Sequence, residues 1–466
     1  MRTLRRMFGR QVIYSSADEI TEANVIEEIR RAYEKHSRNY SDIEYLFKYY
    51  KGEQSILHRQ KEIRPEINNK IVENHAYEIV EFKTGYVFGE PIQYVKRSDE
   101  GTTNDVTELN KLMSVLDKAN VDREIGENQN ICGTAYRGVF PDEENKIEIM
   151  SLDPRFTFVV YRSDISKTPL MGVHYTLDDD RTPTFYIYTK NRSITVKNRQ
   201  IISNKPHALK NIPIIEYPAN TSRLGAFEVV LGLLEAINNT QSDRVNAIEQ
   251  FVQAFVKFIN CDIDEDTFRE MVQLGAIKVK SVEGVNADVD IVSQELNQAY
   301  VQMTKDDLYH TMLIICGMPD RKATSAGDTG QAVMLRDGWS SAEARAKQSE
   351  LIFKKSERKF LTIALRILNN RGLNVTLEML DIKFTRNKTD NLIVKTQGLQ
   401  NQLEAGVHPR IALANVGLYS DAEQVYDESK EYLEKWKISQ PTNGQNQKAS
   451  DNEEDLIDNN SQGENL

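Results

Sequence analysis

The sequence has 466 residues, of which 39% are hydrophobic and 28% are charged, and its formal net charge is −11. A chain of this length exceeds what one compact core holds, so we expect two or three domains. The acidic balance argues against a protein that coats nucleic acid through a broad basic face. Cys132, Cys261 and Cys316 form no CxxC pair, which argues against a disulfide framework or a zinc module.

The chain shows no membrane or secretion signal. No segment approaches the roughly 18 uninterrupted apolar residues of a membrane span. The basic start MRTLRRMFGR is not followed by the apolar run of a signal peptide. We therefore expect a soluble, intracellular protein.

The first predicted elements are helices, followed by strands. Residues 21–82 read as helical, with Thr21 placed as an N-cap and Pro65 interrupting the run. Between about 85 and 220, short β-branched and aromatic runs predict a strand-rich domain that contains one helix near 105–130. The predicted strands are 85–95, 135–142, 156–164, 171–177, 184–190 and 212–218.

A helical period returns over 227–259, which predicts a helix roughly 50 Å long. Its middle, NNTQSDRVN, is polar on nearly all sides, and neighbouring copies of the chain are one way to cover its apolar ends. Residues 261–296 predict an acidic turn, a short helix and two short strands. A second helix, 297–316, is stopped by Gly317 and Pro319.

The segment GMPDRKATSAGDTGQAVMLRDGW, 317–339, precedes a predicted helix of about 30 residues. Residues 339–371 of that helix carry eight Arg or Lys against three Glu. A strand-like run over 375–386 and two or three helices over 390–435 follow, with turns at Gly406 and Pro409. The polar, acidic end of the chain is predicted to be disordered.

The loop after the second helix could hold a phosphate, hold a metal or reach a partner. A phosphate loop needs GK followed by Ser or Thr, and the pair GK does not occur. A dinucleotide turn follows a strand, whereas GDTGQA follows a predicted helix. Either a solvated connection or a projecting finger fits the remaining composition.

Other chemistries lack their motifs. The sequence contains neither GxSxG nor HExxH, and none of its seven histidines are spaced as paired metal ligands. DIDED, 262–266, lacks the glycine and the final glutamate of a calcium loop, and DDD, 178–180, reads as a turn. We expect no catalytic residue, no metal and no cofactor.

The stretch ENHAYEIVEFKTGYVFGEPIQY, 73–94, resembles the opening of the portal proteins of tailed bacteriophages. In that family a helix runs into a Gly-x-x-x-Gly-x-Pro turn, matched here by Gly85, Gly89 and Pro91. The order of parts over about 20–436 is similar as well. In that family, twelve copies form a ring at one capsid vertex, and a terminase motor pumps DNA through its tunnel.

The resemblance implies an α+β portal fold with a mixed strand-rich wing, long stem helices, a small α/β clip and a helical crown. It implies these parts: an N-terminal helical segment at the wing periphery (1–72), the strand-rich wing (73–224), the first stem helix (225–260), the clip (261–296), the second stem helix (297–316), the tunnel loop (317–338), the long wing helix and strand (339–389) and the crown (390–436). Residues 437–466 remain as the predicted disordered acidic tail.

The same resemblance implies two sets of site residues. The tunnel loop would face DNA with Arg321, Lys322, Thr324, Ser325, Gly327, Asp328 and Gly330. The clip would face terminase and adaptor proteins with Asp264, Glu265, Asp266, Lys278 and Lys280. For Arg321 and Lys322, phosphate contact and an ion pair between subunits both stay open. The basic helix face at 345–371 is expected to pair with acidic neighbours rather than with DNA.

The implied partners are further copies of this chain, double-stranded DNA bound without sequence preference, terminase, the major capsid and scaffolding proteins, and head-completion or adaptor proteins. The implied location is the capsid vertex of a virion that is assembled in the bacterial cytoplasm. Twelve copies with a net charge of −11 carry −132 formal charges, which would repel DNA phosphates and prevent a tight grip. The alternatives are a protein-only structural adaptor of a phage head or tail, and an enzyme whose site forms between subunits.

Overall fold

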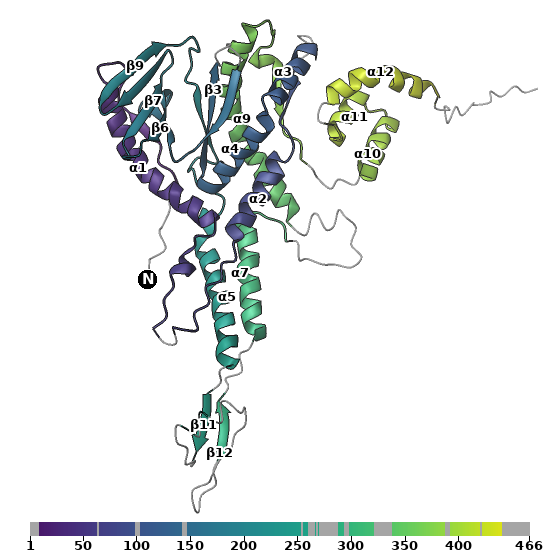
Figure 1. Cartoon of the computed structure of the whole chain (residues 1–466). Coiled ribbons are helices and arrows are strands. Elements are labelled where there is room, and N and C mark those ends of the chain that lie inside the picture. Colours follow the sequence, from purple (N-terminus) through teal and green to yellow (C-terminus); the bar gives the residue numbers. More distant parts are fainter. Residues whose placement is uncertain are drawn as a thin grey trace, which may run out of the picture. The chain divides into compact units, whose positions relative to one another are not determined.

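The computed structural model describes residues 9–62, 65–97, 103–141, 147–252, 255–259, 266, 269, 288–292, 298–320, 338–386, 392–419 and 422–439. The chain forms two compact units, 1–389 and 390–466. Helices and sheets are both present in the first unit (Figure 1), and the class is α+β, as predicted.

The larger sheet has the strand order β1-β5-β6-β7-β8-β9. Its strands are β1 (Ile13–Ser15), β5 (Thr157–Arg162), β6 (Pro169–Leu177), β7 (Pro183–Tyr188), β8 (Arg192–Lys197) and β9 (Gln200–Pro206). β1 is parallel to β5, and the other neighbours are antiparallel. Helix α1 (Val25–Tyr50) covers one face of the sheet, because Val25, Ile29 and Ala32 lie on one side of the helix and pack into the sheet's core.

A smaller antiparallel sheet has the order β10-β3-β4. Its strands are β3 (Thr134–Pro141), β4 (Ile147–Leu152) and β10 (Ile214–Pro218). Helices α3 (Thr103–Val115), α4 (Lys118–Cys132) and α9 (Trp339–Asn369) share one apolar core with it. The ribbon of β2 (Gln93–Lys96) and β13 (Leu380–Lys383) joins the same core. Short 3-10 turns occur at η1 (Ser55–His58), η2 (Glu228–Val230) and η3 (Leu377–Met379).

Two long helices, α5 (Leu231–Val252) and α7 (Gln298–Cys316), lie side by side (Figure 1). In sequence between them is an antiparallel hairpin, β11 (Phe255–Ile259) and β12 (Asp288–Val292). The start of α5 and the end of α7 share a core with the second half of α1, with α2 (His75–Phe88) and with the end of α4. This core fixes one end of the helix pair.

The second unit contains α10 (Leu392–Glu404), α11 (Pro409–Val416) and α12 (Ala422–Ser439). Gly406 has φ +83°, and Pro409 is the first residue of α11, so both mark turns as predicted. The predicted tail begins inside α12, which continues to Ser439. Residues 440–466 lie outside the described part of the chain.

Two predictions near the N-terminus were wrong. Thr21 is not the N-cap of α1, because the helix begins at Val25 after Asn24. The carbonyl of Thr21 instead accepts from the amides of Asn24 and Val25 in a preceding turn. The helical run also ends early: Gly52, with φ +94°, follows the end of α1, and from there to 74 only η1 is helical among the described residues.

Several other boundaries differ from the prediction. Residues 85–88 end α2, so only 93–96 of the predicted strand 85–95 is a strand. The helix expected near 105–130 is two helices, separated where Asp117 adopts φ +51°. The helix predicted for 227–259 ends at Val252, because the β-branched and aromatic residues of 255–259 pair with β12 instead. Strands β1, β4, β8 and β9 were not predicted.

Candidate functional site

The described residues on the two sides of 321–337 lie close together. Gly317 has φ +63° and directly follows α7, and Gly338 has φ +85° and directly precedes α9. A Cβ placed on Gly338 would lie 3.5 Å from the carbonyl oxygen of Met318 and 3.6 Å from Cα of Pro319. Gly338 therefore lies close to Met318 and Pro319, on the two sides of 321–337.

The end of α7 is a Schellman motif, in which a left-handed residue lets two amides turn back onto the last turn. The amide of Gly317 donates to the carbonyl of Ile314 at 3.1 Å, and the amide of Met318 donates to that of Leu313 at 2.9 Å. Leu313 and Met318 are both buried in the same apolar core. The start of the loop is therefore held by backbone bonds and by apolar packing.

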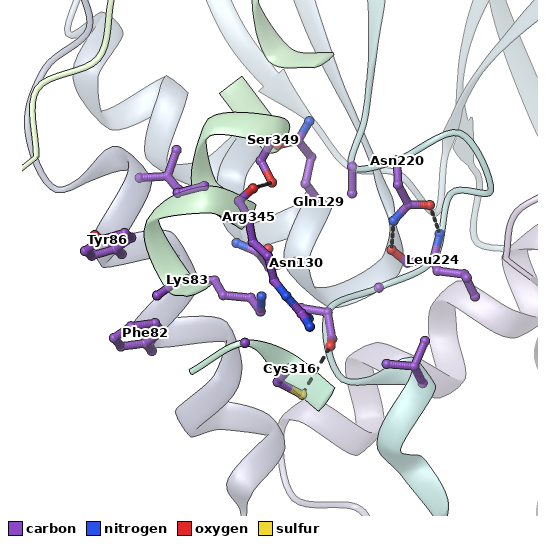
Figure 2. A pocket seen from close by; sticks show the side chains of 18 of the residues that line it. Phe82, Lys83, Tyr86, Gln129, Asn130, Asn220, Leu224, Cys316, Arg345 and Ser349 are labelled. Atoms are coloured by element: carbon purple, nitrogen blue, oxygen red, sulfur yellow. Dashed lines mark hydrogen bonds between the residues drawn. The ribbon is translucent and has the colours of Figure 1, made fainter. Parts of the chain in front are cut away.

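Arg345 of α9 fastens the two helices together. Its guanidinium donates to the carbonyls of Ile314 and Ile315, which lie in the last turn of α7, where helix carbonyls lack partners within the helix. A positive charge at a helix C-terminus is also favoured by the helix dipole. A Cβ on Gly317 would lie 2.3 Å from Cδ of Arg345, so only glycine leaves room for this contact. Figure 2 shows Arg345 reaching toward the end of α7 near Cys316.

The helix pair contains a polar ladder that sequence reasoning missed. Asn238, Ser242 and Asn246 of α5 are buried, with exposed fractions of 0%, 0% and 3%. Their side-chain oxygens accept from backbone amides of the irregular segment 69–73. The contacts are Asn238 with Glu73 at 2.8 Å, Ser242 with Ile71 at 2.9 Å and Asn246 with Asn69 at 2.7 Å.

The ladder can form because the rise of four helix residues nearly equals the rise of two residues of an extended chain. Four residues of a helix rise about 6 Å, and two residues of an extended chain rise about 6.6 Å. Side chains at every fourth helix position therefore meet amides at every second position of segment 69–73. One face of the polar middle of the helix is therefore covered by the same chain, while Asn239 and Asp243 stay exposed.

The described residues contain one dense group of buried charges, at the centre of the first unit. Lys118, Asp122, Arg137 and Glu357 are at most 3% exposed. Arg137 donates to Glu357 at 2.8 Å, and Lys118 lies 2.9 Å from Glu357. Burial alone would raise the pKa of Glu357, but Arg137 and Lys118 outweigh it and lower the pKa to about 2. Side chains this deeply buried cannot meet a substrate, so we assign them a structural role.

The basic residues of α9 have several kinds of partner. Lys347 pairs with Glu343 of the same helix at 3.6 Å. Arg345 binds the carbonyls described above, and Arg366 donates to the carbonyl of Leu209. Of these three cations, Lys347 pairs with an acidic side chain, and Arg345 and Arg366 donate to backbone carbonyls.

The predicted site residues fall mostly outside the described part of the chain. This holds for all seven predicted loop residues, Arg321, Lys322, Thr324, Ser325, Gly327, Asp328 and Gly330, and for Asp264, Glu265, Lys278 and Lys280. Asp266 is described, and it is exposed and helical. Strand β12 lies within 261–296, where two short strands were expected, whereas β11 lies in the segment predicted as the end of the helix 227–259.

Neither a metal-binding cluster nor a membrane-spanning helix occurs among the described residues. Within them, no group of three or more His, Cys, Asp or Glu side chains could hold a metal ion. None of the helices in the same part of the chain is long and apolar enough to cross a membrane.

Comparisons with known proteins give one family. The family model described as "Phage portal protein, SPP1 Gp6-like" matches residues 29–439. No curated protein matches the chain.

The solved structures that match include parts of gene transfer agent (GTA) particles. The neck of an empty GTA particle computed with C6 symmetry has a TM-score of 0.46 and 10% identity, covering 74% of this chain and 90% of that one. The neck of a native GTA particle computed with C12 symmetry has a TM-score of 0.42 and 11% identity, covering 74% of this chain and 89% of that one. The virion of a native GTA particle has a TM-score of 0.43 and 11% identity, covering 77% of this chain and 89% of that one. At these TM-scores the similarities carry no functional information.

Proposed function

The chain belongs to the phage portal protein family, SPP1 Gp6-like, and from that membership we propose that it forms a ring at one vertex of a virion and conducts double-stranded DNA. Ring assembly, DNA passage and docking of terminase and head-tail connector proteins together make up the proposed function. The proposal requires no catalysis.

The observation that carries the proposal is the closed base of the loop. Gly338 lies close to Met318 and Pro319, so the two flanks of 321–337 meet between α7 and α9. Arg345 and the Schellman motif hold that point in place. A polar loop on such a base can touch a passing duplex without reading its bases, which a conduit for every sequence requires.

The charge of the chain supports the same role. With a net charge of −11, a ring of copies repels phosphates in general, so a few loop cations such as Arg321 and Lys322 contact DNA weakly and release it. A bore lined by many basic side chains would instead bind DNA tightly and in a salt-dependent manner.

We assign the parts accordingly. Helices α5 and α7 form the stem, and the hairpin between them belongs to the clip that docks terminase and adaptor proteins. The sheets with α1 to α4 and α9 form the wing, and the unit 390–466 contains the crown. In this assignment the polar ladder stiffens the stem, because it ties α5 to segment 69–73 along three successive steps.

Electron microscopy of the purified chain tests ring formation. We expect rings with a central hole wide enough for B-DNA, and monomers or filaments would contradict the proposal. Deleting 321–330 tests the loop separately. We expect intact rings and loss of DNA packaging or retention, whereas rings of the deletion variant that package DNA normally would favour a protein-only adaptor.

A further inference from the structure

A pocket beside the loop base carries an unbalanced positive charge. It has a volume of about 240 Å³ and lies between α2, α9, the segment 219–229 and the end of α7. Figure 2 shows the side chain of Lys83 extending into it from α2, next to Arg345 from α9. The described residues that line the pocket include these two cations and no Asp or Glu.

The two cations differ in their partners. Arg345 is bound to the carbonyls of Ile314 and Ile315. For Lys83, the described part of the chain offers no hydrogen bond and no ion pair. Asn130 and Gln129 line the same pocket, but they donate to Thr84 and to backbone carbonyls respectively. Among the described residues, the Lys83 ammonium is thus the cation of this pocket that has neither a hydrogen-bond acceptor nor a counter-charge.

The neighbouring thiol does not supply that charge. Burial raises the pKa of Cys316 to about 11, so the thiol is neutral at physiological pH. Burial also lowers the pKa of Lys83, and the charge of Arg345 lowers it further. A lysine in this position gains from a carboxylate partner, because the carboxylate offsets both the lost hydration and the repulsion by Arg345.

Apolar side chains beside the pocket are exposed. Val229 and Ile315 line it and are 56% and 41% exposed, and the adjacent Ile314 is 59% exposed. Exposed apolar side chains beside a cation without a counter-charge are typical of a surface that binds another protein.

We propose that an acidic side chain of a second copy of this chain enters the pocket and pairs with Lys83, while Val229, Ile314 and Ile315 pack against the same neighbour. The proposal rests on the proposed ring, since adjacent copies in a ring supply that side chain. Each loop base is then fastened to the next subunit as well as to its own α9.

Cross-linking tests the pairing directly. Rings are assembled from unlabelled chains mixed with chains labelled with heavy nitrogen, and a carbodiimide then joins amines to carboxylates in direct contact. Mass spectrometry should find peptides in which Lys83 is joined to an Asp or Glu. In some of them one peptide should be unlabelled and the other labelled, which shows that the link joins two copies of the chain. Cross-links of Lys83 only within one chain, or none at all, would overturn the proposal.

The variant Lys83→Met tests the energetic consequence. It removes the unpaired cation from the free chain, so the melting temperature of the monomer should stay equal or rise. It also leaves the neighbour's carboxylate unpaired, so the concentration for half-assembly should rise at least about tenfold. The matched control is Lys347→Met, since Lys347 is exposed and pairs within α9; this variant should assemble as wild type does.

The outcomes separate the two proposals. If the wild type forms no rings, the proposed function fails before Lys83 is tested. If wild-type and Lys83→Met rings assemble alike, only the pairing is wrong. Inorganic phosphate provides a further test. If it stabilises the wild-type monomer but not Lys83→Met, and if the two proteins assemble into rings alike, the pocket binds a free anion and the pairing is wrong.

Discussion

Arg137 of β3 and Glu357 of α9 are 220 residues apart in sequence, and their side chains are hydrogen-bonded at 2.8 Å with both residues fully buried. Tyr217 also donates to Glu357 at 2.8 Å, and Tyr94 donates to it at 2.6 Å. This carboxylate therefore joins the long helix to strands of the small sheet and of the β2–β13 ribbon. The stability of the first unit should depend strongly on it.

We predict that Glu357→Gln destabilises the first unit by about 3 to 5 kcal/mol, because it removes one of the two buried carboxylates that pair with Arg137 and Lys118 and leaves Asp122 to balance both cations. Urea unfolding followed by tryptophan fluorescence measures the loss. Glu27→Gln is the matched control. The pKa of Glu27 is likewise lowered to about 2 by a hydrogen bond from Arg30, but this pair is exposed and its loss should not be measurable. Equal effects of the two variants would refute the structural role of Glu357.

We predict that Ser242→Ala weakens the ladder between α5 and segment 69–73. The variant removes one hydroxyl and leaves the amide of Ile71 without its 2.9 Å acceptor, which costs about 1 to 3 kcal/mol for a buried donor. Hydrogen exchange should show the Ile71 amide losing protection. Asn239→Ala, at an exposed position of the same helix, serves as the control and should leave that protection intact.

We predict that His75 makes the junction of α2 and α7 sensitive to alkaline pH. Its ring nitrogens lie 2.8 Å from Glu78 and 3.1 Å from Glu73, Lys305 also contacts Glu73, and Tyr309 donates to Glu78. Burial alone would lower the pKa of His75, but the two carboxylates outweigh it and raise the pKa to about 9. The stabilisation is fully present below about pH 6.5 and is lost as pH rises through about 9.

The measurement is the free energy of unfolding of wild type minus that of His75→Gln, followed from pH 6 to pH 10. We expect this difference to fall by an amount on the order of 3 kcal/mol across that range. His58→Gln, which replaces an exposed histidine, is measured beside it as the control for the substitution itself. A flat profile for His75→Gln would show that the carboxylates do not hold the proton.

We predict that Gly317→Ala loosens the loop base. The new Cβ would lie 2.3 Å from Cδ of Arg345, and the residue would keep φ +63°, which disfavours a side chain. Arg345 must then leave the carbonyls of α7, and proteolysis near 317–338 should become faster. Gly85→Ala is the control, since its Cβ would meet nothing within 4 Å inside α2, and it should be neutral or stabilising. Unchanged proteolysis of Gly317→Ala would contradict the role of Arg345.

The sequence predicted the helices that flank the loop closely. The predicted 297–316 is α7 (Gln298–Cys316), and the helix expected from Trp339 is α9, because long apolar periods and the stop at Gly317 are local signals. The end of α5 was missed for the opposite reason. Residues 255–259 continue the helical spacing, but pairing with β12, which is distant in sequence, decides their structure.

The residues that hold the site together were visible in the sequence only in part. The spacing of Asn238, Ser242 and Asn246 is helical, but their partners lie 165 to 177 residues away, so a buried ladder and a solvated face look the same. Arg345 was counted among eight basic residues, and its capping role depends on the position of α7. Contacts of this kind follow from the tertiary fold and leave no local pattern.

The ladder also restricts how α5 can move. A displacement of α5 by one residue along its axis rotates it by about 100° and withdraws all three acceptors together. Sliding by a full four residues brings either Leu234, which has no acceptor, or Gln250, which is one methylene longer than asparagine, into the row. Helix α5 and segment 69–73 can therefore turn together as one body, but a slide of one along the other reaches no second register with the same three acceptors.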